Sequence, residues 1–134
     1  MENQKNLLCD ISTPALAYLG DSVLELLVRQ ALVEAGISSS KKLNERALSF
    51  VSAPAQAAAV KNIIDLLTDE EAAYFKRGRN IGHTNTPKNA SVGEYRMATG
   101  FETLFGYLRL VGNEPRAAEL FSIAYARELE ELKK

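Results

Sequence analysis

At 134 residues the chain is long enough to bury one apolar core, and 46% hydrophobic with 25% charged residues is the balance of a soluble globular protein. Its single cysteine, Cys9, excludes an internal disulfide and suits a reducing compartment. The N-terminus lacks the apolar stretch of a signal peptide, and no window approaches the ~18 apolar residues of a membrane span, so a cytoplasmic protein is expected.

Charge is unevenly distributed along the chain, although the formal net charge is only −1. The segment 76–96 contains five basic residues and one acid, a local charge of +4, while the remainder carries −5. Such a segment can form an anion-attracting face on a nearly neutral molecule. A solvated loop that only maintains solubility is the alternative that composition leaves open.

Three helices are predicted in the first half of the chain, over residues 13–35, 39–50 and 52–67. Each begins at a serine or threonine whose hydroxyl can accept a hydrogen bond from an unpaired backbone N–H. Proline in the first turn supports the first and third helices, and a glycine is placed to end the first. These signals are Thr13, Pro14 and Gly36, then Ser39 or Ser40, then Ser52 and Pro54.

Three further helices are predicted over residues 68–77, 91–111 and 115–132. The first two begin with capping boxes, in which a serine or threonine is followed three residues later by a glutamate. The stretch 79–90 shows no periodicity and is predicted to be a loop. Six helices and no strand pair predict an all-α fold.

Helical-wheel patterns alone do not identify an active site. In the first helix the predicted core sector is flanked by Leu24 and Val28, while Asp21 and Glu25 lie on the other side. In the helix over 91–111, Glu102 lies beside the apolar stripe. These patterns equally describe ordinary solvated acids. The predicted core residues are Leu16, Leu19, Val23, Leu26 and Leu27 in the first helix and Met97, Phe101, Leu104, Phe105 and Leu108 in the later one.

Three sequence motifs carry more information than periodicity. The segment LAYLGDSVLEL (16–26) resembles the ribonuclease III signature helix, with an aromatic residue, Leu-Gly-Asp, a small residue and an apolar pair. The segment ATGFETLFGYL (98–108) resembles the second acidic motif of that family. KRGRN (76–80), TPKN (86–89) and YR (95–96) resemble the mini ribonuclease III subfamily. Because the motifs occur in the family order from about Pro14 to Leu110, the chain is identified as a member.

The resemblance implies a fold, a reaction and a metal site. Residues 1–134 are expected to form a single, all-α ribonuclease III catalytic domain, with 1–12 loosely ordered. Asp21 and Glu102 correspond to the family's metal-binding and catalytic acids, so Mg²⁺, with Mn²⁺ as a substitute, is the expected cofactor. Hard oxygen ligands suit Mg²⁺, which can shield the phosphate, activate water and stabilise the leaving oxygen. The implied reaction cuts double-stranded RNA, leaving 5′-phosphate and 3′-hydroxyl ends, in maturation of the 23S ribosomal RNA precursor.

The chain departs from the larger ribonuclease III enzymes at several acidic positions. Their acids three and seven residues before the signature aspartate align with Ala17 or Tyr18 and with Pro14. The aspartate three residues before the second glutamate aligns with Thr99. We expect fewer protein ligands and weaker Mg²⁺ binding as a result. Glu25, one turn from Asp21, is either close to the metal or solvent-facing.

The chain is expected to have no double-stranded-RNA-binding domain, so RNA contacts are expected on the catalytic domain itself. A-form duplexes are recognised mainly through shape, phosphates and 2′-hydroxyls. Basic side chains would contact phosphates, and short polar side chains would contact sugars or base edges. The candidate RNA-binding residues are Lys76, Arg77, Arg79, Asn80, Asn85, Thr86, Lys88, Asn89 and Arg96.

A homodimer is also implied, because signature helices in this family pack about a two-fold axis. The broad apolar sector of the first helix and the close approach that Gly20 permits agree with this, although a buried helix in a monomer explains both. Two rival functions remain. The missing acids favour a non-catalytic RNA-binding or ribosome-assembly module, and the helix count alone would suit a protein-interaction adaptor.

Overall fold

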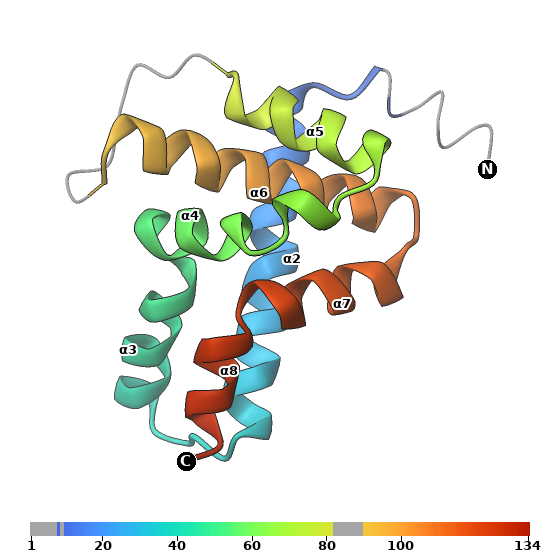
Figure 1. Ribbon diagram of the computed structural model, residues 1–134. Helices are drawn as coiled ribbons and strands as arrows, with labels where there is room; N and C mark the ends of the chain where they lie inside the picture. Colours follow the sequence, from blue (N-terminus) through green and yellow to red (C-terminus); the bar gives the residue numbers. More distant parts are fainter. Residues whose placement is uncertain (1–7, 9, 82–89) are drawn as a thin grey trace.

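The computed structural model describes residues 8, 10–81 and 90–134, and all regular secondary structure within them is helical (Figure 1). The expected all-α class is confirmed. No helix in these ranges is both long and apolar enough to cross a lipid bilayer. The elements are α2 (Thr13–Glu34), α3 (Ser40–Val51), α4 (Ala53–Lys61), the 3₁₀ turn η1 (Ile64–Leu66), α5 (Asp69–Arg79), α6 (Val92–Leu110), α7 (Glu114–Ala124) and α8 (Ala126–Leu132).

The two longest helices, α2 and α6, cross with their backbones in contact. A Cβ atom on Gly20 of α2 would collide with the backbone carbonyl of Glu102, and one on Gly106 of α6 with that of Leu16. Because both positions are glycine, the helix axes can approach more closely than larger side chains would allow. This crossing sets the position of every side chain on the facing surfaces of the two helices.

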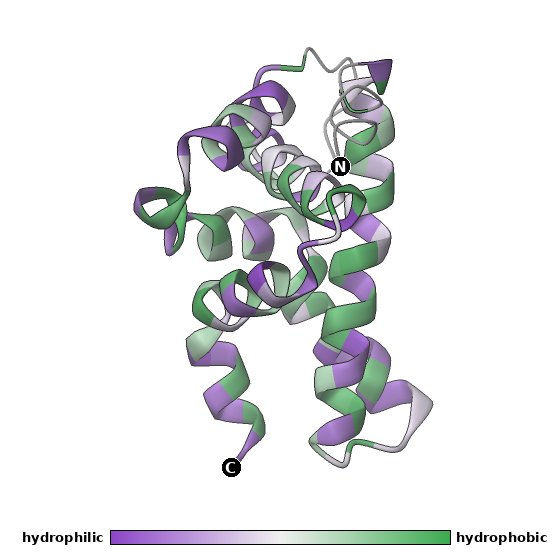
Figure 2. Ribbon diagram, turned by 90° about the vertical axis from the view of Figure 1, so that its right-hand side faces the viewer, coloured by the Kyte–Doolittle hydropathy of each residue, from purple (hydrophilic) through white to green (hydrophobic). Residues whose placement is uncertain are grey.

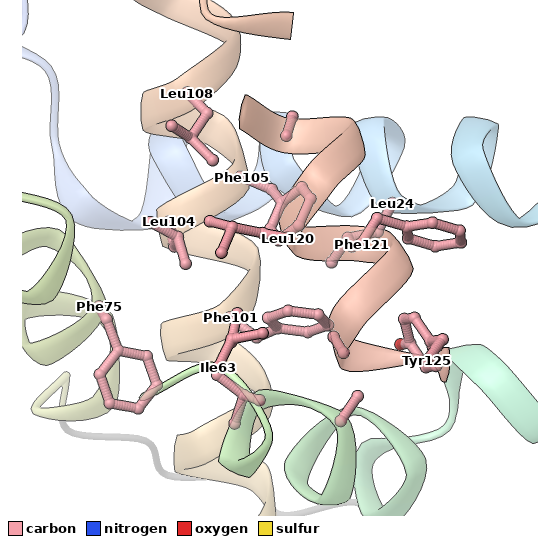
Figure 3. Close-up of a cluster of buried hydrophobic side chains, with 14 of the residues drawn as sticks. Leu24, Ile63, Phe75, Phe101, Leu104, Phe105, Leu108, Leu120, Phe121 and Tyr125 are labelled. Carbon is pink, nitrogen blue, oxygen red and sulfur yellow. The ribbon is translucent and has the colours of Figure 1, made fainter. Parts of the chain in front are cut away.

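The hydrophobic core surrounds α6 (Figure 3). One face of α6 supplies four fully buried side chains, and α7 packs its own aromatic and leucine side chains against them. Phe101 and Phe105 meet edge to face with ring centroids 5.0 Å apart, a favourable aromatic geometry. Leu8, from the segment expected to be loosely ordered, is 2% exposed and belongs to this core. The other labelled core residues are Leu24, Ile63, Phe75, Leu104, Leu108, Leu120, Phe121 and Tyr125.

Most predicted helix boundaries lie within two residues of the observed ones. Both predicted capping boxes are confirmed, at the starts of α5 and α6. The N-cap of α2 is Ser12 and not Thr13, since the Ser12 hydroxyl accepts from the Ala15 N–H at 3.1 Å. The third predicted helix ends at Lys61, six residues early, and η1 takes up only Ile64–Leu66 of the remaining stretch.

The prediction of one helix over 115–132 is wrong, because the backbone leaves the helical region at Tyr125 (φ −111°, ψ 26°). Tertiary contacts account for the break. The buried Tyr125 hydroxyl donates to the Phe50 carbonyl at 2.6 Å, and the Asn62 amide donates to the Ala124 carbonyl at 2.9 Å. The described residues therefore form seven α-helices where six were predicted.

The predicted core sector of α2 is also wrong in part. Leu26, expected in the core, is 65% exposed, and Leu19, Val23 and Leu27 are only partly buried. The glycine crossing turns another face of α2 toward α6, and the second apolar face remains accessible. The residues of α2 that are buried are Leu16, Ala17, Gly20, Leu24, Val28 and Leu32.

Candidate active site

A cleft of about 220 Å³ lies where α2 crosses α6. Asp21 on α2 and Glu102 on α6, 81 positions apart in the sequence, both line it. The structure therefore brings together the two acids that were predicted as metal ligands. The lining residues are Pro14, Ala17, Tyr18, Asp21, Ile81, Tyr95, Thr99 and Glu102.

The glycine contact explains why these two acids meet. Asp21 directly follows Gly20, and the backbone carbonyl that Gly20 approaches is that of Glu102 itself. The two carboxyl groups therefore start from backbone segments in van der Waals contact. They are close enough to share a hydrogen bond.

Burial and the neighbouring acid both favour the protonated form of Glu102. Desolvation is the larger cause, followed by the hydrogen bond with Asp21 and its negative charge, and together they raise the pKa of Glu102 to about 8. At neutral pH and without a cation, the protonated form of Glu102 is therefore favoured. A strongly perturbed acid beside a charged partner in a cleft is typical of a functional site.

This pair fits a divalent cation by its donor chemistry. Carboxylate oxygens are hard ligands, and a cation between them would replace the shared proton and offset the repulsion between two negative charges. Within the described ranges there is no cluster of three or more His, Cys, Asp and Glu side chains suited to a metal. Water and a phosphate oxygen would have to fill the remaining positions of an octahedral shell.

The pH dependence of stability tests this electrostatic account. Because the folded pKa of Glu102, about 8, lies above the ordinary glutamate value of 4.5, the folded state holds an extra proton between these values. The free energy of unfolding of the metal-free protein should therefore fall as pH rises through this window. Thermal unfolding in EDTA across pH 5–9 should show a shallower decline in Glu102→Gln than in the unmodified protein. Equal slopes would contradict the assignment.

Uncharged side chains occupy the positions that align with the additional acids of larger enzymes. Pro14, Ala17, Tyr18 and Thr99 all line the same cleft. Thr99 is 5% exposed and its hydroxyl donates to the Tyr95 carbonyl at 3.0 Å. The positions that are acidic in the larger enzymes therefore line the cleft of this protein as well, but their side chains carry no negative charge here.

The structure decides between the two interpretations of Glu25, and it shows one cleft residue that the sequence analysis missed. Glu25 does not line the cleft, and its carboxylate accepts two hydrogen bonds from Arg29, at 3.1 and 3.2 Å. Ile81 does line the cleft but was missed, because a single apolar residue in a predicted loop gives no signal of its own.

The predicted RNA-binding residues differ in their exposure to solvent and in the contacts that their side chains make. Lys76, Asn80 and Arg96 are exposed, while Arg79 is partly buried with its guanidinium 5.8 Å from the Phe75 ring centroid. Arg77 is engaged in contacts with the start of α2. The four remaining candidates, Asn85, Thr86, Lys88 and Asn89, lie outside the described residues.

Comparisons with known proteins agree with this architecture. The model of the ribonuclease III domain matches residues 14–113, a range that contains both acids. Mini-ribonuclease 3 of Enterococcus faecalis is 43% identical over 110 residues, covering 81% of this chain and 83% of that protein. The protein of the same name from Clostridium tetani is 40% identical over 109 residues, covering 81% of this chain and 72% of its own.

A solved structure provides an independent comparison of the fold. The crystal structure of a protein from Fusobacterium nucleatum superposes with a TM-score of 0.81 at 30% identity, covering 90% of this chain and 92% of that one. The helical fold, the paired acids in the cleft and the match to the domain model all point to the same family. The chain belongs to the ribonuclease III family, in its mini-ribonuclease III branch, and is an endoribonuclease.

Proposed function

We propose that the chain is a Mg²⁺-dependent enzyme that hydrolyses both strands of double-stranded RNA, with Asp21 and Glu102 as its metal ligands. The observation that carries this proposal is the shared cleft in which the two carboxyl groups meet. Family membership supplies the reaction class, and the paired carboxyl groups supply the donors that phosphodiester hydrolysis requires.

The roles of the two acids follow from their environments. Bound Mg²⁺ would neutralise phosphate charge and lower the pKa of a coordinated water. Asp21 is exposed and offers its carboxylate to an approaching phosphate–metal unit, whereas half-buried Glu102 must release its proton before it can act as a ligand. We therefore expect cation binding to release a proton and to strengthen as pH rises toward 8.

Basic residues next to the cleft support an RNA substrate. Arg79 and Asn80 immediately precede Ile81, and Arg96 follows Tyr95, while Ile81 and Tyr95 both line the cleft. Two arginines are therefore sequence neighbours of residues that line the cleft, and basic side chains suit contacts with a phosphate backbone. We also propose RNA contacts in the segment that joins α5 to α6 in the sequence, by Asn85, Thr86, Lys88 and Asn89.

The likeness to Mini-ribonuclease 3 proteins supports a narrower substrate and product. We infer that the natural substrate is the 23S ribosomal RNA precursor and that the products carry 5′-phosphate and 3′-hydroxyl ends. Mn²⁺ should replace Mg²⁺, because it has similar oxygen-ligand preferences. Incubating purified protein with duplex RNA in Mg²⁺, in Mn²⁺ and in EDTA tests the proposal. Binding without cleavage in either metal would favour the non-catalytic alternative.

The second apolar face of α2 supports a homodimer. It forms one side of a groove of about 640 Å³ whose other side is α7 and α8. Figure 2 shows α2 standing beside α7, with hydrophobic positions recurring along its length. Leu19, Val23, Leu26 and Leu27 line the groove, with Phe121 of α7. We propose that α2 of a second copy covers this groove about a two-fold axis, so that two clefts act on one duplex.

Replacing Leu26 by Glu should convert the dimer into a monomer of about half the mass. The charge would be buried without a partner at the proposed interface, which costs several kcal/mol. Leu48→Glu on α3 is the matched control, since Leu48 is 63% exposed, close to the 65% of Leu26, but lies outside the groove. Light scattering at micromolar concentration measures the result. If both variants have the mass of the unmodified protein, the groove is not the interface.

A further inference from the structure

Arg77 makes a set of contacts unlike those of the other basic residues near the cleft. Its Nε donates to the hydroxyl oxygen of Thr13 at 3.1 Å, and a terminal nitrogen donates to the carbonyl oxygen of Ile11 at 3.3 Å. Thr13 is the first residue of α2, and Ile11 lies two residues before it. One side chain at the end of α5 therefore holds the chain at the entry to α2.

A stack of aromatic rings fixes the guanidinium in place. It lies 5.0 Å from the ring centroid of Tyr74, which itself stacks on Tyr107 with centroids 4.2 Å apart and planes at 17°. Tyr107 is 7% exposed and belongs to the hydrophobic core. Because Tyr107, the ring of the stack farthest from the guanidinium, is buried in the core, the guanidinium plane has little freedom to turn toward a ligand.

The segments that Arg77 joins both contribute lining residues to the catalytic cleft. Pro14, directly after Thr13, and Ala17 line it from α2, and Ile81, four residues after Arg77, lines it from the end of α5. Releasing the Arg77 contacts would free the first turn of α2 from α5 while the Gly20 crossing stayed in place. The separation between the lining residues of α2 and Ile81 would then vary, and with it the placement of the scissile phosphate beside Asp21.

We propose that Arg77 is a positioning residue that holds the first turn of α2 against α5 and so fixes the width of the catalytic cleft. This assignment replaces the sequence-based interpretation of Arg77 as an RNA contact, and it rests on the proposed function of the cleft. A planar guanidinium suits the role, because it donates in two directions while stacking on a ring, which an ammonium group does not do.

Thr13→Val is the most informative test, because it removes one acceptor of Arg77 and leaves every charge unchanged. Ser12, and not Thr13, caps α2, so the helix start is retained. We expect both Thr13→Val and Arg77→Lys to slow single-turnover cleavage at saturating RNA and Mg²⁺. A displacement of about 1 Å can cost up to roughly a hundredfold in rate, so a fall of about tenfold is expected.

RNA affinity distinguishes positioning from direct contact. Measured at several salt concentrations in an Asp21→Asn background, affinity and salt dependence should be the same with and without Thr13→Val or Arg77→Lys. Lys76→Ala, which removes an exposed neighbouring cation, should weaken binding and reduce the log–log salt slope by roughly 0.7–0.9. Low millimolar guanidinium, compared with equal NaCl, should partly restore cleavage to Arg77→Ala.

Three outcomes would overturn the proposal. The first is unchanged single-turnover cleavage in Thr13→Val and Arg77→Lys, whether or not their melting temperatures fall. The second is a reduced salt slope in the Arg77 variants, which would make Arg77 an RNA contact. The third is that Thr13→Val cleaves RNA at the rate of the unmodified protein while Arg77→Lys cleaves it more slowly. Failure of the proposed function would look different. The unmodified protein would bind duplex RNA without cleaving it, or Asp21→Asn would cleave at the rate of the unmodified protein.

Discussion

Replacing Asp21 by Asn should nearly abolish RNA cleavage while leaving the fold and the affinity for duplex RNA intact. The amide keeps the shape of the carboxyl group but removes the charge that attracts the cation. A bound divalent metal is worth several kcal/mol of transition-state stabilisation, and about 4 kcal/mol corresponds to roughly a thousandfold in rate. Gel-resolved cleavage of duplex RNA at saturating RNA and Mg²⁺ measures this loss.

Glu25→Gln is the matched control for this experiment. Glu25 lies one turn after Asp21 on the same helix but outside the cleft, where it pairs with Arg29. The control should cleave at the rate of the unmodified protein. Cleavage at that rate by Asp21→Asn as well would contradict the proposal that Asp21 is a metal ligand.

Glu102→Gln separates metal affinity from chemistry. Glutamine resembles the protonated form of Glu102, which burial and Asp21 favour. We expect the same severe loss as for Asp21→Asn at ordinary Mg²⁺. Recovery at high Mg²⁺ would mean that Glu102 raises cation affinity but is not needed for the reaction itself.

Local signals in the sequence predicted most of the helices correctly. Capping boxes and first-turn prolines depend on residues within one turn of each other, so they can be recognised without knowledge of the tertiary structure. The break at Tyr125 depends instead on Phe50 and Asn62, which are 75 and 63 positions away. No pattern within 115–132 could have shown it.

The buried face of α2 could not be predicted for a related reason. Its leucines and valines cover more than one face, and a helical wheel cannot say which of these packs against the core. The glycines decide it, because the closest approach of α2 and α6 lies at Gly20 and Gly106. The sector around Leu26, which looked most apolar in the sequence, does not face the core and lines the groove between α2 and α7.

The same contact limited what the sequence could say about the site. Neither Asp21 nor Glu102 differs from a solvated acid in its helical pattern, and only the family motifs singled them out. Their proximity depends on the α2–α6 crossing, and the raised pKa of Glu102 depends on that proximity. The contacts of Arg77 were beyond the same limit, because its charge and basic neighbours suggested RNA and nothing in the sequence pointed to Thr13 and Ile11.

Gly20→Ala should therefore destabilise the protein far more than a single methyl group suggests. The new Cβ would overlap the backbone carbonyl of Glu102, and a backbone atom cannot rotate away as a side chain can. Overpacking costs about 1–3 kcal/mol even where side chains can adjust, so a cost of at least about 3 kcal/mol is expected. The helix-propensity gain of alanine over glycine, about 1 kcal/mol, offsets only part of it.

Gly93→Ala in α6 provides the matched comparison, because the nearest atom to its added Cβ, the Ser91 hydroxyl oxygen, is 3.9 Å away. That variant should keep or slightly raise the melting temperature, while Gly20→Ala should lower it by roughly 10 °C for a chain of this size. The residual folded Gly20→Ala protein should also bind Mg²⁺ more weakly, since α2 must move away from Glu102 to accommodate the methyl group. Equal melting temperatures for the two variants would show that the helices do not meet at Gly20, and the paired acids would lose the contact that brings them together.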